Sequence, residues 1–210
     1  MKHFTALITA LTIFASLAQA EVLAPATTNA PGKWSASLLG ARQTNSNNNS
    51  SLSQTIYGLD LSYGLANRTQ LDLTYESGNF SGISGMELSL RSLTASLKYN
   101  LLLETPVSLA IGASYTSISQ QDNFAGSPSG SNYGCKIVVS KMFLPFIPYA
   151  CLNRSFTSLA GESSATEATL GSVWLIANGF SASVENTWQL QSGGYTSGLF
   201  SLTASCNPAL

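Results

Sequence analysis

The feature of this sequence that most restricts its fold is a two-residue alternation of apolar and small polar side chains. It is clearest in segment 54–66, where alternate positions hold Tyr57, Leu59, Leu61, Tyr63 and Leu65. The positions between them hold Gly58, Asp60, Ser62 and Gly64. Segments 70–76, 106–119 and 180–190 repeat the pattern. Because successive side chains of a β-strand point to opposite faces, the alternation predicts strands with one apolar and one polar face.

Six further segments are strand-like, although their facing is less regular: 33–41, 86–99, 132–143, 148–158, 166–177 and 195–206. In segment 86–99 the apolar positions change phase between Leu90 and Leu93, and one extra residue in a strand produces such a change. We therefore predict a β-bulge near Arg91 and Ser92. The sequence thus predicts about ten strands, an even number, with about eight as the alternative.

The links between these segments alternate in length. Short links fall at 67–69, 100–105, 144–147 and 178–179. Longer polar links fall at 42–53, 77–85, 120–131 and 159–165, and the fifth link of this second set, 191–194, is short but Gly-rich. Outer-membrane barrels have short periplasmic turns and long external loops. The alternation therefore predicts that both chain termini lie on the periplasmic side.

Composition favours a membrane over water as the surroundings of these strands. Charged residues make up 9% of the chain, whereas soluble proteins contain about 25%. A soluble lipocalin-like barrel or a sandwich would explain the alternation too, with its apolar faces inside. However, faces of Gly, Ser, Thr and Ala fit a narrow, filled interior better than a solvent surface. We therefore predict an all-β fold, a closed antiparallel transmembrane β-barrel in which every strand is paired.

Residues 1–20 have the three parts of a secretory signal peptide. Lys2 and His3 supply a positive start, residues 6–17 are mostly apolar, and residues 18–20 form an A-x-A cleavage site. The apolar run is shorter than the about 20 residues that a membrane-spanning helix needs. We expect cleavage between Ala20 and Glu21, which leaves residues 21–210 as one barrel domain.

The aromatic residues fall into two groups if the short links mark one rim of the barrel. The group near that rim is Trp34, Tyr63, Tyr99, Tyr149, Trp174 and Phe180. The group near the opposite rim is Tyr57, Tyr75, Tyr115, Tyr133, Phe156, Trp188 and Tyr195. Amphipathic rings prefer the headgroup level of a bilayer, so the sequence predicts two aromatic girdles. A general preference of aromatic residues for strand ends is the alternative explanation.

A small set of charged residues is predicted to face the lumen: Asp60, Asp72, Glu76, Glu87, Arg91, Lys98 and Glu185. A three-residue turn at 67–69 would place Asp60 opposite Glu76. Two carboxylates at that distance repel each other, so a cation or a proton must offset them. Arg91 and Lys98 on the next strand are the nearest candidates. The cluster is then either a salt-bridged plug in a packed lumen or a cation-lined constriction of a pore.

The sequence offers little for catalysis. His3 is the only histidine and lies in the predicted signal peptide, so a histidine base, a histidine-assisted nucleophile and a histidine metal site are not expected. The cysteines at 135, 151 and 206 form no C-x-x-C motif. Either one disulfide with a free thiol or three unpaired thiols fits their odd number. The formal net charge of −1 gives no reason to expect nucleic acid as a partner. We predict a non-catalytic protein without metal or cofactor.

The A-Q-A signal, the strands YGLDLSYGL and TQLDLTY and the long polar links resemble the small outer-membrane β-barrel families of Gram-negative bacteria, including opacity-type and OmpA/OmpX-like barrels. The resemblance covers residues 21–210 and is architectural. It implies a location in the outer membrane. We predict a monomer in contact with outer-membrane lipid that acts as a narrow porin-like barrel for small solutes or as a structural barrel. The alternative is an adhesin that binds host surface ligands through loops 42–53 and 120–131.

Overall fold

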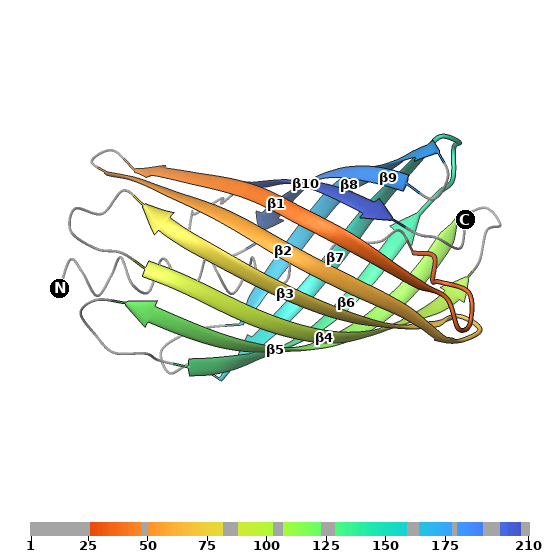
Figure 1. Ribbon diagram of the computed structural model, residues 1–210, viewed down its shortest axis with the longest axis horizontal. Helices are drawn as coiled ribbons and strands as arrows, with labels where there is room; N and C mark the ends of the chain where they lie inside the picture. The colour runs from red at the N-terminus through yellow and green to blue at the C-terminus, as the bar shows by residue number, and fades with distance from the viewer. Residues whose placement is uncertain are drawn as a thin grey trace.

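A computed structural model describes residues 26–47, 50–81, 88–102, 107–122, 129–158, 164–177, 180–190 and 198–206. This part of the chain forms ten β-strands (Figure 1). Their bounds are β1 (Trp34–Asn47), β2 (Ser50–Ala66), β3 (Thr69–Ser81), β4 (Leu88–Leu102), β5 (Ser108–Asp122), β6 (Ser129–Ser140), β7 (Phe146–Thr157), β8 (Ala165–Ala177), β9 (Phe180–Gln189) and β10 (Gly198–Cys206). The predicted signal peptide lies outside the described residues.

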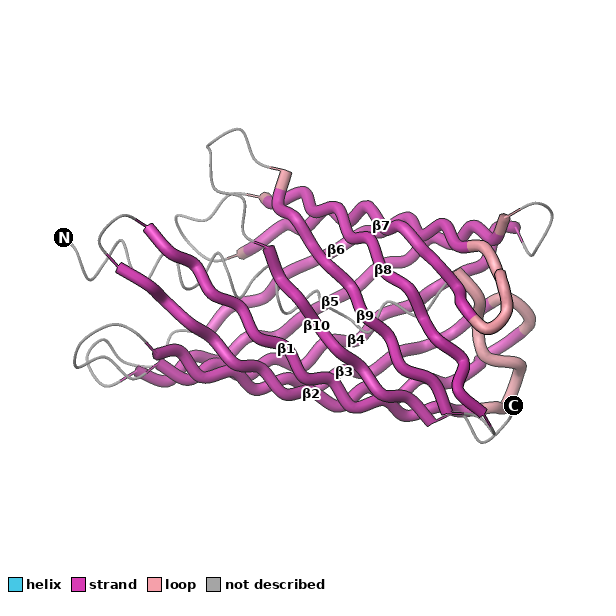
Figure 2. Tube along the Cα trace, turned by 90° about the horizontal axis from the view of Figure 1, so that it is seen from above, coloured by secondary structure: helices cyan, strands magenta, loops and turns pink. Residues whose placement is uncertain are grey.

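The ten strands close into a single antiparallel ring. Each strand pairs with its neighbours in sequence, and β1 pairs with β10 from Ala36↔Cys206 to Arg42↔Phe200. The strands run obliquely to the long axis of the barrel (Figures 1 and 2). The predicted closed barrel is confirmed, with ten strands rather than eight. No helix in the described ranges is long and apolar enough to cross a membrane.

The barrel points its apolar side chains outward and its polar ones inward. On β2, Leu59 and Leu61 are 42% and 45% exposed, whereas Asp60 between them is 4% exposed. On β4, Leu93 and Leu97 are outside, while the serine and threonine side chains between them are buried. A soluble lipocalin-like barrel has the reverse arrangement, so that alternative is wrong. The closed ring also leaves no strand edge unpaired, as a hydrocarbon surrounding requires.

The links differ in length at the two ends of the barrel. We call one the short-turn end; its links are residues 67–68, 103–107, 141–145 and 178–179. The opposite, long-link end has links at 82–87, 123–128, 158–164 and 190–197, and the much shorter link 48–49. The last of the long links is therefore longer than the predicted 191–194. The predicted alternation holds except between β1 and β2.

The predicted long loop at 42–53 is wrong. β1 and β2 continue through most of this segment and pair from Arg42↔Thr55 to Asn47↔Ser50. The run of Asn and Ser suggested a loop because those side chains favour turns. A β-ladder, however, is built from backbone hydrogen bonds, and it continues through polar residues when the partner strand is already aligned.

The predicted register between β2 and β3 is also wrong. Asp60 lies opposite Thr74, and Glu76 lies opposite Gly58. The strands are joined by residues 67–68, with Arg68 in the left-handed region at a φ of 69°. A register shift between residues 64 and 66 accompanies this turn. A tighter turn than the predicted one moves every pair on these strands relative to its partner.

β4 lacks the bulge predicted near Arg91 and Ser92. Its ladders with β3 and β5 run without a register shift from Leu88 to Asn100. Leu90 instead points into the barrel and is 0% exposed. The change of phase in the sequence therefore marks an apolar side chain inside the barrel, not an extra residue in the strand.

Candidate functional site

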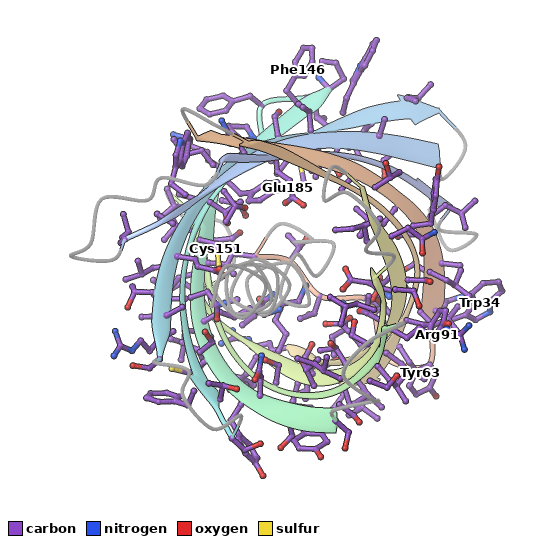
Figure 3. The ribbon with its side chains drawn as sticks, turned by 90° about the vertical axis from the view of Figure 1, so that its left-hand side faces the viewer. Trp34, Tyr63, Arg91, Phe146, Cys151 and Glu185 are labelled. Atoms are coloured by element: carbon purple, nitrogen blue, oxygen red, sulfur yellow. The ribbon has the colours of Figure 1, made fainter. Side chains whose placement is uncertain are left out.

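The candidate site is the polar interior of the barrel. Seven charged side chains of the described residues are buried there, five acids and two lysines: Asp60, Asp72, Glu76, Glu167, Glu185, Lys98 and Lys136. Figure 3 looks along the barrel and shows Glu185 and Cys151 inside the ring, with Trp34, Tyr63 and Arg91 outside it. The described interior thus holds three more carboxyl groups than amino groups.

Asp60 on β2 and Asp72 and Glu76 on β3 form what we call the acidic wall. Asp60 accepts hydrogen bonds from the hydroxyls of Thr74 (2.7 Å) and Ser62 (3.1 Å). Because Thr74 is the direct cross-strand partner of Asp60, the strand register itself brings this donor to the carboxyl group. Such donors compensate part of the cost of removing a carboxylate from bulk water.

Asp72 is held between β2 and β4. It accepts hydrogen bonds from Gln70 and from the hydroxyl of Ser96, the latter at 3.3 Å. Lys98 lies directly opposite Gln70 and therefore diagonal to Asp72. Diagonal neighbours lie roughly 7–8 Å apart, a distance that a lysine side chain bridges. Among the described residues of β2 to β4, Lys98 therefore provides the one buried amino group beside the three carboxyl groups of the acidic wall.

Glu76 is the most enclosed member of the acidic wall, with 1% of its surface exposed. Its Oε2 accepts a hydrogen bond from Ser92 (3.1 Å), whereas its Oε1 has no partner among the described residues. Glu167, on the other side of the ring, has the same arrangement: Asn153 donates to Oε2 (3.3 Å), and Oε1 has no partner within the described ranges. In that part of the chain Asn132 and Asn100 add further side-chain atoms without partners. Buried polar atoms in folded proteins nearly always have a partner, so water or a solute is expected to reach this interior.

A second charged group extends over β6 to β9. Tyr149 on β7 donates a hydrogen bond of 2.6 Å to Glu185 on β9. Gly171 lies between them on β8, as the direct partner of both residues. A Cβ atom at Gly171 would be 2.4 Å from the ring of Tyr149. Glycine is therefore required here, because the tyrosine ring crosses this residue to reach Glu185.

Lys136 on β6 likewise lies across a glycine of the neighbouring strand. Its direct partner on β5 is Gly112, and a Cβ atom there would be 2.8 Å from the lysine Cε. On the other side its partner is Asn153, which itself lies opposite Glu167. The lysine chain therefore lies flat on the wall above a glycine.

Among the described residues no three carboxylate, thiol or imidazole groups converge as a metal site would require.

No family model and no curated protein sequence matches this chain. Among solved structures, the β domain of the Bordetella autotransporter BrkA is 15% identical, with a TM-score of 0.56, and the match covers 84% of this chain and 98% of that one. The translocator domain of the autotransporter NalP from Neisseria meningitidis is 9% identical, with a TM-score of 0.55 and 98% of both chains covered. An outer membrane channel from Pseudomonas putida F1 is 9% identical, with a TM-score of 0.55, 85% of this chain and 97% of that chain covered. The chain has the fold of an outer-membrane β-barrel.

The predicted lumen residues are only partly brought together. Asp60, Asp72, Glu76, Lys98 and Glu185 point inward. Arg91, predicted to offset the acidic wall, instead lies on the outer face, one residue after the inward-facing Leu90 (Figure 3). The reason is the absent bulge, since an uninterrupted β4 turns Arg91 outward. Glu87 lies outside the described residues.

Lys136 and Glu167 are interior charges that the sequence analysis missed. Three consecutive apolar residues at 137–139 hide the phase of β6, of which Val138 faces inward at 0% exposure. On β8, where Glu167 lies, a signal is present: the outward-facing Leu170 and Trp174 set a phase that places Glu167 on the inner face. The facing of both strands is ambiguous in the sequence because both inner faces also contain apolar residues.

The aromatic residues predicted as girdles mostly project outward. Near the short-turn end these are Trp34, Tyr63, Tyr99 and Trp174, and toward the long-link end Tyr133 and Phe156. Tyr57, Tyr75 and Tyr115 also project outward, but they lie at the middle of β2, β3 and β5 rather than at that rim. Tyr149 is an exception, because it points inward and is 4% exposed. Trp188 is half-buried, and the side chain of Phe180 and the whole of Tyr195 lie outside the described part. Phe146, absent from the predicted set, stacks on Trp174 with ring centroids 6.0 Å apart.

The two cysteines with described side chains are free thiols. Cys135 faces outward, and Cys151 is buried in the lumen wall. The side chain of Cys206 lies outside the described residues.

Proposed function

We propose that this chain is a non-catalytic outer-membrane barrel that acts as a narrow pore preferring small cations. The observation that carries the proposal is the surplus of carboxyl groups in the interior, five against two lysines among the described residues. Cations passing through a lumen with this balance would be attracted to its wall, and anions would be repelled.

A structural barrel with a dry, packed core is the competing explanation. Such a core would have to pair its charges, because an unpaired buried charge costs several kcal/mol. The two lysines can pair with at most two of the five acids. The unpartnered Oε1 atoms of Glu76 and Glu167 point the same way, since a wet lumen supplies the partners that the protein does not. These features favour a hydrated interior.

The surroundings proposed for the barrel are outer-membrane lipid, with the short-turn end and both termini on the periplasmic side. The apolar outer face and the outward aromatic residues support contact with lipid. The difference in link length at the two ends supports the orientation. We propose a monomer, because a ring closed on itself has no strand edge to offer a second copy.

The test is conduction by purified barrels in planar lipid bilayers under a salt gradient. We expect small currents whose reversal potential indicates a preference for cations. Asp60→Asn combined with Glu76→Gln should reduce that preference, and Lys98→Gln should increase it. Arg91→Gln is the matched control: it also removes a charge, but on the outer face, and should leave the reversal potential unchanged.

Closure of each barrel is checked separately by gel migration with and without boiling. If the parent and all lumen variants form closed barrels but pass no current, the pore proposal is overturned in favour of a structural or adhesive barrel. A preference for anions would overturn it equally.

A further inference from the structure

Of the residues that precede β1, 26–29 lie inside the mouth of the barrel, and 30–33 form an exposed turn at its rim. This turn is closed by a hydrogen bond of 3.0 Å from the Lys33 N–H to the Ala30 carbonyl. Pro31 and Gly32 occupy its central positions, and Gly32 has a φ of 75°. Proline followed by glycine with positive φ is the signature of a type II turn. The sequence therefore encodes the reversal of the chain at the start of β1.

The turn is attached to β2 by backbone hydrogen bonds. The Gly32 N–H donates to the Gly64 carbonyl (2.8 Å), and the Gly64 N–H donates to the Lys33 carbonyl (2.9 Å). The approach is so close that a Cβ atom at Gly64 would lie 2.2 Å from the Ala30 carbonyl oxygen and 2.6 Å from that of Asn29. Glycine at residue 64 is therefore a condition for the segment to lie where it does.

Beyond the turn the segment makes contacts with successive strands. The backbone N–H of Asn29 donates to the side chain of Gln70 on β3 (2.7 Å). Asn100 on β4 donates to the hydroxyl of Thr28 (3.5 Å). The backbone N–H of Ala26 donates to the hydroxyl of Ser140 on β6 (2.9 Å). The contacts thus run from β2 through β3 and β4 to β6.

This path crosses the whole lumen. In a ring of ten strands β6 lies opposite β1. With strands about 4.8 Å apart and tilted by about 40°, such a ring is about 20 Å across between backbones. The turn occupies residues 30–33, and the four steps from Ala30 to Ala26 span at most about 14 Å. Together with the wall side chains that it contacts, the segment connects opposite walls, and it lies at the right-hand end of the barrel in Figure 1, where β1 begins.

The far end of the segment is sealed by apolar packing. Ala26 is 0% exposed and belongs to a cluster of buried side chains on β5 to β8, namely Ala110, Val138, Ile147, Tyr149, Cys151 and Val173. These residues are the apolar part of an otherwise polar interior. An alanine packed among them excludes water from the mouth at this point.

We infer that residues 26–33 are a plug that closes the short-turn end of the barrel and must shift for ions to pass. The inference rests on the proposed pore function. Hydrogen bonds at both ends and one buried alanine hold the plug in the mouth of the barrel. Because the plug buries little apolar surface, its local opening costs less free energy than the separation of the barrel strands.

The experiment compares two glycine-to-alanine variants of the full chain. Gly64→Ala places a methyl group on the plug backbone, whereas Gly40→Ala on β1 meets no atom within 4 Å. Ser140→Ala is a milder second variant, since it removes only the acceptor for the Ala26 N–H. Two quantities are measured on barrels of verified closure: the mean current at fixed voltage, and the rate at which Thr28→Cys, added to each variant, reacts with a membrane-impermeant maleimide. Peptide mass spectrometry counts the label at residue 28 alone.

We expect Ser140→Ala to raise labelling at residue 28 about fivefold, the effect of one net hydrogen bond on an opening equilibrium. Gly64→Ala should raise it further, and both variants should raise the current, while Gly40→Ala should match the parent. If Gly64→Ala changes neither quantity, the plug is overturned and the pore proposal stands. If labelling at residue 28 rises but no variant conducts, the position of the segment in the lumen is supported. The pore proposal then fails, and so does the gating role of the segment.

Discussion

A single outward-facing leucine tests whether this barrel spans a lipid bilayer. Leu61 lies on β2 with Ala36 and Leu73 as its direct partners, and it is 45% exposed. On the same face of the strand it lies between Tyr57 and Tyr63. Leu61 also lies five residues before the end of β2 at Ala66, which is about 17 Å along the strand or about 13 Å along the axis at a tilt of about 40°. The apolar band of a membrane barrel is about 25 Å tall, so Leu61 lies near its middle if the short-turn end marks one border.

Leu61→Arg should destabilise the barrel by about 2–4 kcal/mol, the cost of an arginine on the lipid face near the midplane. This corresponds to a roughly 30-fold to 1,000-fold change in the folding equilibrium. The assay is denaturant unfolding in lipid vesicles, followed by tryptophan fluorescence and gel migration. Asn79→Arg is the control, because Asn79 is also exposed but lies near the long-link end of β3. It should cost about 0–1 kcal/mol.

The reasoning is refuted if both arginines have the same effect. A neutral Leu61→Arg would mean that the outer face is in contact with water, where an exposed leucine contributes little to stability. The membrane location and the pore would then both be wrong, although the ring of strands would remain.

Three smaller predictions concern particular contacts. Gly171→Val should destabilise the barrel by about 1–3 kcal/mol, because a side chain there collides with the tyrosine ring crossing it; unchanged unfolding in denaturant would contradict this. In vesicles Cys135 should react with an apolar maleimide and Cys151 only after denaturation, as read from labelled peptides; equal labelling would show that the lumen wall is open to the reagent. Alanine substitutions of Phe146 and Trp174 should be coupled by about 0.5–1.5 kcal/mol in a double-mutant cycle, and simple additivity would mean that the stacked rings do not interact.

The fold could be predicted from the sequence because the two faces of the clean strands differ so consistently. At residues 57–65 every second side chain is large and apolar, and each of these is outside in the structure. No long-range information is needed for this assignment, since the alternation of a strand is a local property. Closure then follows from the membrane, which tolerates no unpaired edge.

The interior was harder to predict because it depends on registers and on exceptions to the alternation. The predicted partner of Asp60, Glu76, lies two residues beyond the actual partner, Thr74, since the length of the turn at Arg68 depends on a backbone conformation that the sequence does not reveal. Leu90 is an apolar side chain inside the barrel, so it interrupts the apolar alternation of β4 in the sequence. For this reason Arg91 was predicted to face the lumen, whereas it lies on the outer face. The plug could not be predicted for another reason. Pro31 and Gly32 indicate a turn, but the path of the chain before the turn depends on contacts with β2, β3, β4 and β6, which only the closed barrel brings together.

The pairing of β1 with β10 has a consequence for how this protein can be made. The first strand to be synthesised finds one of its two partners only when the last one arrives, so no shorter version of the ring is complete. Loss of residues 198–206 would therefore expose the unpaired backbone of β1 and β9 to hydrocarbon, where every unsatisfied peptide group is costly. We therefore expect the ring to close only when the whole chain is available, because the final nine residues of the sheet complete it.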